Sequence, residues 1–231
     1  MKRNLAVVLA SGGMDSCVTL AEAVAGGLEP ALMHVQYGQR TQRRERLAFT
    51  YIADHYCVPA ERRLVVDISH LAAIGGSSLT DPAEPVADGH LDAPGVPRTY
   101  VPFRNGNLIS IAASWAEVLG AESIWLGVVE EDGSGYPDCR AGFIRAMELA
   151  LRLGSAGGGE LRIETPLIAL DKAGIVRRGL ELEAPFALTW SCYREEERAC
   201  GTCDSCLLRL RGFQRAGATD PIPYRQDSAG R

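Results

Sequence analysis

Apolar residues occur along this chain in two arrangements, as short continuous runs and as longer stretches with a spacing of three or four residues. Short runs rich in Val, Leu and Ile, such as LAVVLA near the N-terminus, are typical of strands that are buried on both faces of a sheet. The sequence predicts five such strands, at residues 5–10, 30–37, 62–69, 123–129 and 160–167.

The stretches between these runs have the spacing of amphipathic helices. Leu47, Tyr51 and His55 follow one another at intervals of four residues and would share one helix face. Strands that alternate with helices predict an α/β fold, doubly wound around a mostly parallel sheet, in which ligands bind at the carboxyl ends of the strands. Helices are predicted at residues 15–27, 41–56, 107–120, 140–154 and 170–182.

Two segments interrupt this alternation. Residues 70–102 are rich in Pro, Gly and Asp, and a loop of this length in a compact domain is either disordered or functional. We interpret it as a lid candidate. Residues 154–160, GSAGGGE, are interpreted as a flexible connector.

Length and composition are those of one globular domain. The chain has 231 residues, of which 46% are hydrophobic and 23% charged, so we expect a single domain over residues 1–231. No apolar run approaches the ~20 residues that a membrane-spanning helix needs. The first apolar run is short and enters a glycine turn, which favours a strand over a signal peptide.

The charge balance favours a small substrate over a nucleic acid. The formal net charge is −5, whereas a strong tRNA binder usually presents a basic face. Two basic clusters, at residues 40–46 and 209–215, are interpreted as solvated helix faces. We therefore expect neither a nucleic-acid partner nor a membrane partner.

Four of the seven cysteines lie close together near the C-terminus. Cys192 is followed by the C-x2-C-x2-C sequence of Cys200, Cys203 and Cys206, a spacing that suits a closed tetrahedral zinc site. A [4Fe–4S] cluster, which uses a related spacing, and four free thiols are the alternatives. Residues 189–223 are thus predicted to form a zinc-binding helical segment. An odd cysteine count without a signal peptide indicates a reducing compartment, the cytoplasm.

The stretch SGGMDS, residues 11–16, joins the first predicted strand to the first predicted helix. A glycine turn here presents free backbone N–H groups and the positive end of a helix dipole, which together favour an anion. The stretch lacks the lysine of a Walker A loop, so a phosphate would be held by backbone, hydroxyl groups and metal. A plain strand–turn–helix corner is the alternative interpretation.

SGGMDS resembles the signature of the PP-loop ATP pyrophosphatases, enzymes of the adenine nucleotide alpha hydrolase-like fold that cleave ATP to AMP and pyrophosphate. TPLIALDKAGIV is similar to the Pro-Leu and Lys element of the same enzymes. The resemblance implies catalytic roles for Asp15, Ser16, Lys172 and Arg104, with a surface lysine as the alternative for Lys172. It also implies nucleotide contacts from the loop and from YGQR: Leu9, Ala10, Ser11, Gly12, Gly13, Met14, Asp15, Ser16, Tyr37, Gly38 and Gln39.

Four stretches together resemble the 7-cyano-7-deazaguanine synthase family of the queuosine pathway: SGGMDS, YGQR, SGYPDCR and LTWSCY…CGTCDSCLLRLRGF. The resemblance extends from about residue 5 to residue 223. It implies conversion of 7-carboxy-7-deazaguanine and ammonia to the nitrile through an adenylated acid and an adenylated amide. It also implies the use of ATP, Mg²⁺ and a structural Zn²⁺, the release of AMP and pyrophosphate, and a homodimer.

The same resemblance implies substrate contacts from four further residues, with a structured turn as the alternative for the SGYPDCR stretch. The family often has a small residue where this chain has Phe103. The implied substrate contacts are Asn105, Tyr136, Asp138 and Arg140.

Two other functions stay open on the sequence. One is a PP-loop relative that adenylates another carboxylate or attaches a deazaguanine-like base to a macromolecule. The other is a zinc-stabilised nucleotide-binding module without turnover, which would bind ATP without releasing pyrophosphate.

Overall fold

The computed structural model describes residues 4–89, 95–130, 135–156 and 161–225. In this part of the chain one parallel sheet has the strand order β3-β2-β1-β4-β5. Its strands are β1 (Leu5–Leu9), β2 (Glu29–Gln36), β3 (Arg63–Asp67), β4 (Ser123–Trp125) and β5 (Arg162–Glu164). The order reverses between β1 and β4, which confirms the predicted doubly wound fold and locates its topological switch point.

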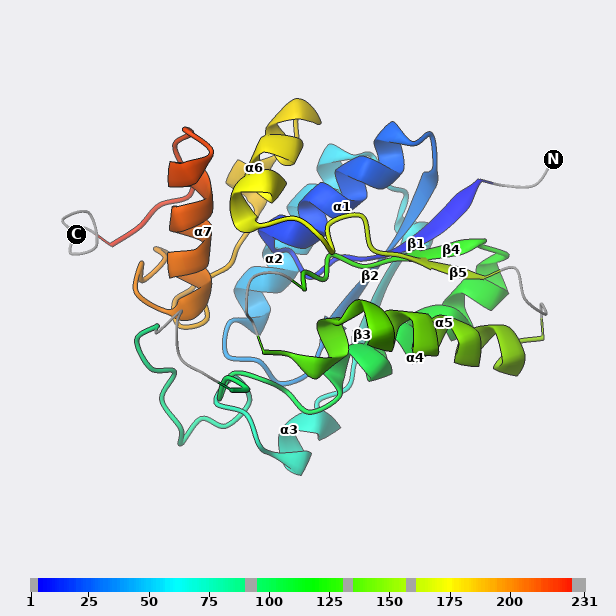
Figure 1. Ribbon diagram of the computed structural model, residues 1–231, viewed down its shortest axis with the longest axis horizontal. Coiled ribbons are helices and arrows are strands. Elements are labelled where there is room, and N and C mark those ends of the chain that lie inside the picture. The colour runs from blue at the N-terminus through cyan, green and yellow to red at the C-terminus, as the bar shows by residue number, and fades with distance from the viewer. Residues whose placement is uncertain (1–3, 90–94, 131–134, 157–160, 226–231) are drawn as a thin grey trace.

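Helices cover both faces of the sheet (Figure 1). One face carries α1 (Met14–Ala25), α2 (Gln42–His55) and α6 (Lys172–Glu181), with α7 (Asp204–Arg215) packed beside α6. The other face carries α4 (Arg104–Leu119) and α5 (Ala141–Gly154). Among the described helices, none is both long enough and apolar enough to cross a bilayer.

Each face of the sheet has its own apolar core, because successive side chains of a strand point to opposite sides. In β1, Val7 belongs to the core shared with Ile109 of α4, whereas Val8 belongs to the core shared with Leu20 of α1 and Ile175 of α6. Since both faces are buried, the strand appears in the sequence as a continuous apolar run.

Two predicted strands end earlier than the sequence indicates. Strand β4 ends at Trp125 and β5 at Glu164. Beyond them, the two segments are joined by backbone hydrogen bonds from Leu126 N to Glu164 O and from Glu130 N to Ile168 O, both at 3.0 Å, but neither segment continues as a strand. The apolar residues Val128 and Val129 stay buried, which explains why they resembled strand residues.

The described part of the predicted lid packs on the body of the domain. Residues His70–Ile74 form the short helix α3, and Leu79, Val86 and Val101 are buried. Arg40 donates to the backbone carbonyls of Ser78, Asp81 and Glu84, so this segment is anchored to the end of β2. Residues 90–94 of the lid and 157–160 of the predicted connector lie outside the described residues.

The interpretation of residues 209–215 as a solvated basic face is wrong for one residue. Arg209 on α7 is only 1% exposed and lies inside the protein, while Arg215 on the same helix is exposed. Arg209 faces inward because it has polar partners there, which are described below.

Candidate active site

A cavity of about 300 Å³ opens at the carboxyl ends of β1, β2 and β4, beside the switch point. This is where a doubly wound sheet is expected to bind a ligand. Of the predicted catalytic, nucleotide-binding and substrate-binding residues, five are not part of the lining: Gly12, Gly38, Gln39, Asp138 and Arg140. The predicted residues that do line it are Leu9, Ala10, Ser11, Gly13, Met14, Asp15, Ser16, Tyr37, Arg104, Asn105, Tyr136 and Lys172.

The glycine-rich loop fits closely against α2. Gly12 has φ +89°, and a Cβ at this position would lie 2.6 Å from the carbonyl oxygen of Glu45, so only glycine is tolerated. Inside the loop, Gly13 N donates to Ser11 Oγ at 3.2 Å, and Ser16 Oγ donates to Gly13 O at 3.1 Å. The backbone and both serine hydroxyls therefore gather at the start of α1, as anion binding requires.

Asp15 and Lys172 form an ion pair across the cavity wall, with 2.9 Å between Lys172 Nζ and Asp15 Oδ2. Lys172 is the first residue of α6, and Asp171 caps this helix by accepting from Gly174 N at 2.7 Å. The other carboxylate oxygen, Asp15 Oδ1, is buried and has no hydrogen-bond partner among the described residues. The pair thus offers a cation and a spare anionic oxygen at one point.

Arg104 brings a second cation to the cavity from the start of α4. Its Nη1 donates to Tyr37 OH at 3.2 Å, and its guanidinium carbon lies 5.4 Å from the centroid of the Tyr37 ring. Burial raises the pKa of Tyr37 to about 12, so this residue is a neutral hydroxyl that supports Arg104. Arg104 Nε is buried without a hydrogen-bond partner in the described part of the chain.

Phe103, which precedes Arg104, lies in the left-handed region at φ +53°. A glycine would adopt this conformation without strain, which agrees with the small residue expected here from the resemblance. The Phe103 ring instead packs edge-on against Phe143, with the ring centroids 5.6 Å apart.

The four predicted substrate contacts fall into two groups. Asn105 and Tyr136 line the cavity, whereas Asp138 accepts from Asn105 N at 2.8 Å and so caps α4. Arg140 is exposed and immediately precedes α5. Cys139 is buried as expected, and burial raises the pKa of its thiol to about 11. For Asp138 the geometry favours the structured-turn interpretation.

Glu45 is a cavity residue that the sequence analysis missed. Its Oε2 accepts from Gln39 Nε2 at 2.9 Å, and its Oε1 accepts from Thr41 Oγ1 at 2.8 Å. Both donors are neutral, and burial raises the pKa of the Glu45 carboxyl. Gln39 also accepts from Tyr37 N at 2.8 Å. Gln39 therefore holds Glu45 and Tyr37 in place from behind the cavity wall.

The four clustered cysteines come together as predicted. Their Sγ atoms all lie within 4.8 Å of one another, and all four residues are buried. Backbone N–H groups point at the sulfurs, for example Cys200 N at 3.3 Å from Cys192 Sγ and Cys203 N at 3.3 Å from Cys200 Sγ. Four buried thiols with N–H donors around them fit a closed structural site for a thiophilic metal ion.

Comparisons with known proteins show the family of this chain. The family model described as "Queuosine biosynthesis protein QueC" matches residues 5–217. The chain belongs to the QueC family. The 7-cyano-7-deazaguanine synthase of Chlorobium phaeobacteroides (strain DSM 266 / SMG 266 / 2430) is 56% identical over 221 residues, which cover 96% of this chain and 97% of the relative. That of Chlorobium chlorochromatii (strain CaD3) is 53% identical over 219 residues, 95% of each chain.

A solved structure shares the fold of this chain. The crystal structure of a 4-thiouridine synthetase–RNA complex with bound ATP matches with a TM-score of 0.53 at 16% identity, over 92% of this chain and 50% of that chain. At this identity the match shows a shared fold. The predicted resemblance and the predicted fold class are therefore both confirmed.

In this QueC family member, the four-cysteine segment also forms part of the cavity wall. Trp190, Ser191 and Tyr193 line the cavity just before and just after Cys192. From α7, the lining residues are Ser205, Leu208 and the buried Arg209. Residues 189–223 were predicted as a zinc-binding subregion of the single domain. The four cysteines do not line the cavity, but residues next to them in the chain do.

His34 of β2 contacts the backbone that leads into the glycine-rich loop. It is fully buried, its Nδ1 lies 3.1 Å from Ala10 O, and its ring lies 5.2 Å from that of Phe49. Burial lowers the pKa of His34 to about 4, because the charged imidazolium would be desolvated. The folded protein therefore holds His34 neutral where an exposed histidine becomes charged.

This predicts an acid-sensitive step in stability. Since the pKa falls from 6.5 to about 4 on folding, the stabilisation is complete above pH 6.5 and is lost as the pH falls toward 4. The shift corresponds to about 3 kcal/mol. Urea unfolding at several pH values should show a loss of this size in the parent, a smaller loss in His34→Asn, and the parental loss in the exposed control His55→Asn. Equal slopes in all three would contradict the assignment.

Proposed function

We propose that this chain converts 7-carboxy-7-deazaguanine, ammonia and ATP to 7-cyano-7-deazaguanine, AMP and pyrophosphate. The observation that carries the proposal is one cavity that joins the SGGMDS loop, the Asp15–Lys172 pair and Arg104, in a chain that matches the QueC family along most of its length. The loop and Lys172 can bind the phosphates of ATP, and Arg104 can bind the carboxylate of the substrate.

In this proposal ATP binds with its phosphates at the start of α1. Backbone N–H groups of the loop and the hydroxyls of Ser11 and Ser16 hold phosphate oxygens, and Lys172 stabilises the charge that builds up on the departing pyrophosphate. The free Asp15 Oδ1 is the kind of hard oxygen that Mg²⁺ prefers, so Asp15 would hold the ion. Bound magnesium would supply charge neutralisation at the phosphates.

Arg104 positions the substrate acid. Its unpartnered Nε and its forked guanidinium can hold a carboxylate in two hydrogen bonds, while Tyr37 fixes the orientation of the fork. The carboxylate oxygen then attacks the α-phosphorus of ATP, and pyrophosphate leaves. Ammonia displaces AMP to give the amide. A second ATP adenylates the amide oxygen, and loss of AMP and a proton leaves the nitrile.

We assign Glu45 the role of general base for ammonia. It lies in the cavity wall behind Gly12, next to the loop that would hold the reacting phosphate. As the carboxylate it takes a proton from ammonium, and the free ammonia attacks the acyl carbon of the adenylated acid. Its raised pKa suits this exchange, and the charges that act on it are Arg104 of α4 and Glu196 near the metal site.

Glu45→Gln tests this role, because only the first half of the reaction uses ammonia. The variant should lower kcat/KM for ammonium in amide formation by about a hundredfold. It should convert the ready-made amide to the nitrile at nearly the parental rate. Alkaline pH, which supplies free ammonia, should restore part of the lost rate. Glu61→Gln, on the exposed turn before β3, is the matched control. An equal loss in both halves would indicate a structural role instead.

A product analysis tests the function itself. The purified protein is mixed with magnesium ATP, ammonium and 7-carboxy-7-deazaguanine, and the products are identified by mass spectrometry. Nitrile with AMP and pyrophosphate is the expected result. ATP cleavage without nitrile would indicate a PP-loop relative with another acceptor, and ATP binding without cleavage would indicate a binding module.

The remaining features of the proposal concern the assembled protein. Zinc in the four-cysteine site, free ammonia as the nitrogen source and a cytoplasmic location follow from the thiol chemistry and from the family. A homodimer is supported by exposed apolar residues on adjoining helices, Val118 of α4 (82% exposed) and Leu153 of α5 (80%). Light scattering that gave the mass of a monomer would contradict the dimer.

A further inference from the structure

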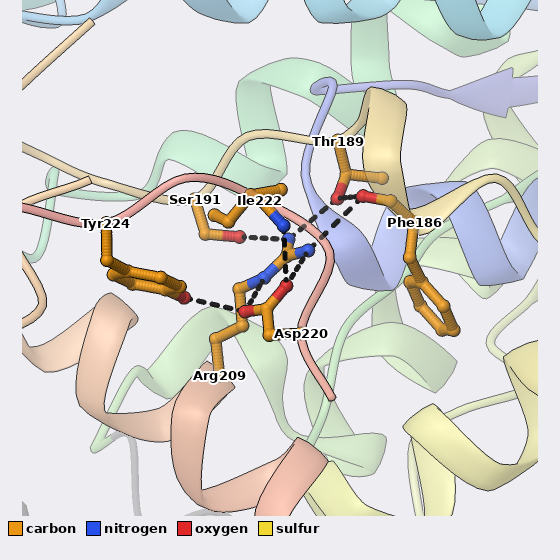
Figure 2. Close-up of polar contacts among 7 residues, drawn as sticks. All are labelled: Phe186, Thr189, Ser191, Arg209, Asp220, Ile222 and Tyr224. Carbon is orange, nitrogen blue, oxygen red and sulfur yellow. Dashed lines mark hydrogen bonds and ion pairs between the residues drawn. The ribbon is translucent and has the colours of Figure 1, made fainter. Parts of the chain in front are cut away.

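Arg209 is a buried cation to which the proposed reaction gives no role. Only 1% of its side chain is exposed, and the side chain of its partner Asp220 is 4% exposed. Two parallel hydrogen bonds join them, Nε to Oδ2 at 2.7 Å and Nη2 to Oδ1 at 2.9 Å (Figure 2). Tyr224 OH donates to Asp220 Oδ2 at 2.6 Å and completes the pair. A buried ion pair of this kind is weak evidence for stability, so its geometry points to another use.

The rest of the guanidinium holds the segment before the first metal ligand. Nη1 donates to Thr189 Oγ1 at 2.7 Å and to Ser191 Oγ at 3.2 Å, and Nη2 donates to Phe186 O at 3.3 Å. In Figure 2 these groups surround the end of the Arg209 side chain. Thr189 and Ser191 flank Trp190, so Arg209 fixes the backbone on both sides of that residue.

Trp190 passes this constraint to the glycine-rich loop. Its backbone N–H donates to Gly12 O at 2.8 Å. The C=O of Gly12 and the N–H of Gly13 belong to one planar peptide and point in opposite directions. Holding Gly12 O on Trp190 therefore aims Gly13 N–H away from Trp190, where it now meets Ser11 Oγ at 3.2 Å.

We propose that Arg209 is a positioning residue for nucleotide binding, which acts through residues 189–191 to aim the Gly12–Gly13 peptide at a phosphate of ATP. Arg209 lies three residues after Cys206 on α7, and Ser191 lies just before Cys192. The metal site and the Arg209 fork thus hold the same segment from adjacent points. The inference rests on the proposed function in one respect, which is that the loop binds ATP.

Arg209→Lys is the first test, because lysine keeps the charge but loses the fork. The dissociation constant for magnesium ATP, measured by calorimetry without the other substrates, should rise about tenfold, as expected for one misdirected hydrogen bond to a phosphate. KM for ATP should rise equally in amide formation and in nitrile formation. KM for ammonium and the metal content per chain should stay at the parental values.

The control variant is Arg211→Lys on the same helix, where none of these contacts is made, and it should bind ATP as the parent does. Thr189→Val is a milder second variant, because it removes one acceptor of Arg209 and leaves the ion pair with Asp220 intact. It should raise the dissociation constant about threefold.

Parental ATP affinity in a folded Arg209→Lys protein would overturn the inference, as would a lower kcat with every KM unchanged. If Arg209→Lys does not fold, parental affinity in Thr189→Val overturns it. Failure of the proposed function is a separate result: the parent would then make no nitrile, while the ATP-binding comparison still decides the role of Arg209.

Discussion

Replacing Lys172 with Met is expected to slow the release of pyrophosphate by about a hundredfold to a thousandfold. Lys172 Nζ lies 2.9 Å from Asp15 Oδ2, at the start of α1, where the phosphates of ATP would bind. Charge builds up on the departing pyrophosphate, and a fixed cation stabilises that charge more in the transition state than in the bound substrate. The loss should therefore appear in kcat more than in KM for ATP. Release of pyrophosphate from ATP in single-turnover experiments measures it.

Two further variants make this test specific. Arg177→Met, on the exposed side of α6, removes a cation from the same helix and should leave the rate unchanged. Asp15→Asn should also abolish most pyrophosphate release, and the double variant should lose less than the two single losses combined, because the residues act as a unit. A Lys172→Met protein with parental turnover would remove Lys172 from the catalytic set.

How far the sequence could predict this site depends on how local each signal is. The anion-binding features of SGGMDS are local, since the glycines, the hydroxyl groups and the helix start all lie within six neighbouring residues. The cysteine cluster is equally local, because ligand spacing within one short segment limits the coordination geometry. Both were predicted. The pairing of Asp15 with Lys172 spans 157 positions and was not predicted, although the family resemblance implied a role for each residue.

The residues whose interpretation changes in the structure depend on distant partners. RLRGFQR has the composition of a solvated helix face, and nothing within it indicates that Asp220, Thr189 and Phe186 surround Arg209. Asp138 follows a turn-rich stretch and resembled a ligand contact, yet the start of α4 uses it as a cap. The free N–H groups at a helix start often bind a nearby carboxylate in this way. A polar residue after a strand is therefore not by itself a binding residue.

Replacing Cys203 with Ser is expected to remove the bound metal and to lower the melting temperature by more than 10 °C, on the order of several kcal/mol lost from a structural site. Cys203 is fully buried, and its Sγ lies within 4.8 Å of the other three. One missing thiolate opens the site, because the three remaining sulfurs cannot complete a closed tetrahedral shell. Metal analysis by mass spectrometry and a thermal melt measure both effects.

The matched control is Cys57→Ser, because Cys57 is an exposed cysteine outside the cluster. It should keep one metal ion per chain and the parental melting temperature. The same analysis identifies the ion: zinc is colourless, whereas a [4Fe–4S] cluster would make the protein brown and give four irons per chain. A Cys203→Ser protein that melts like the parent would mean that α7 and residues 189–191 keep their places without metal. Arg209 and its hydrogen bonds would then hold this wall of the cavity alone, and chelators would leave ATP binding intact.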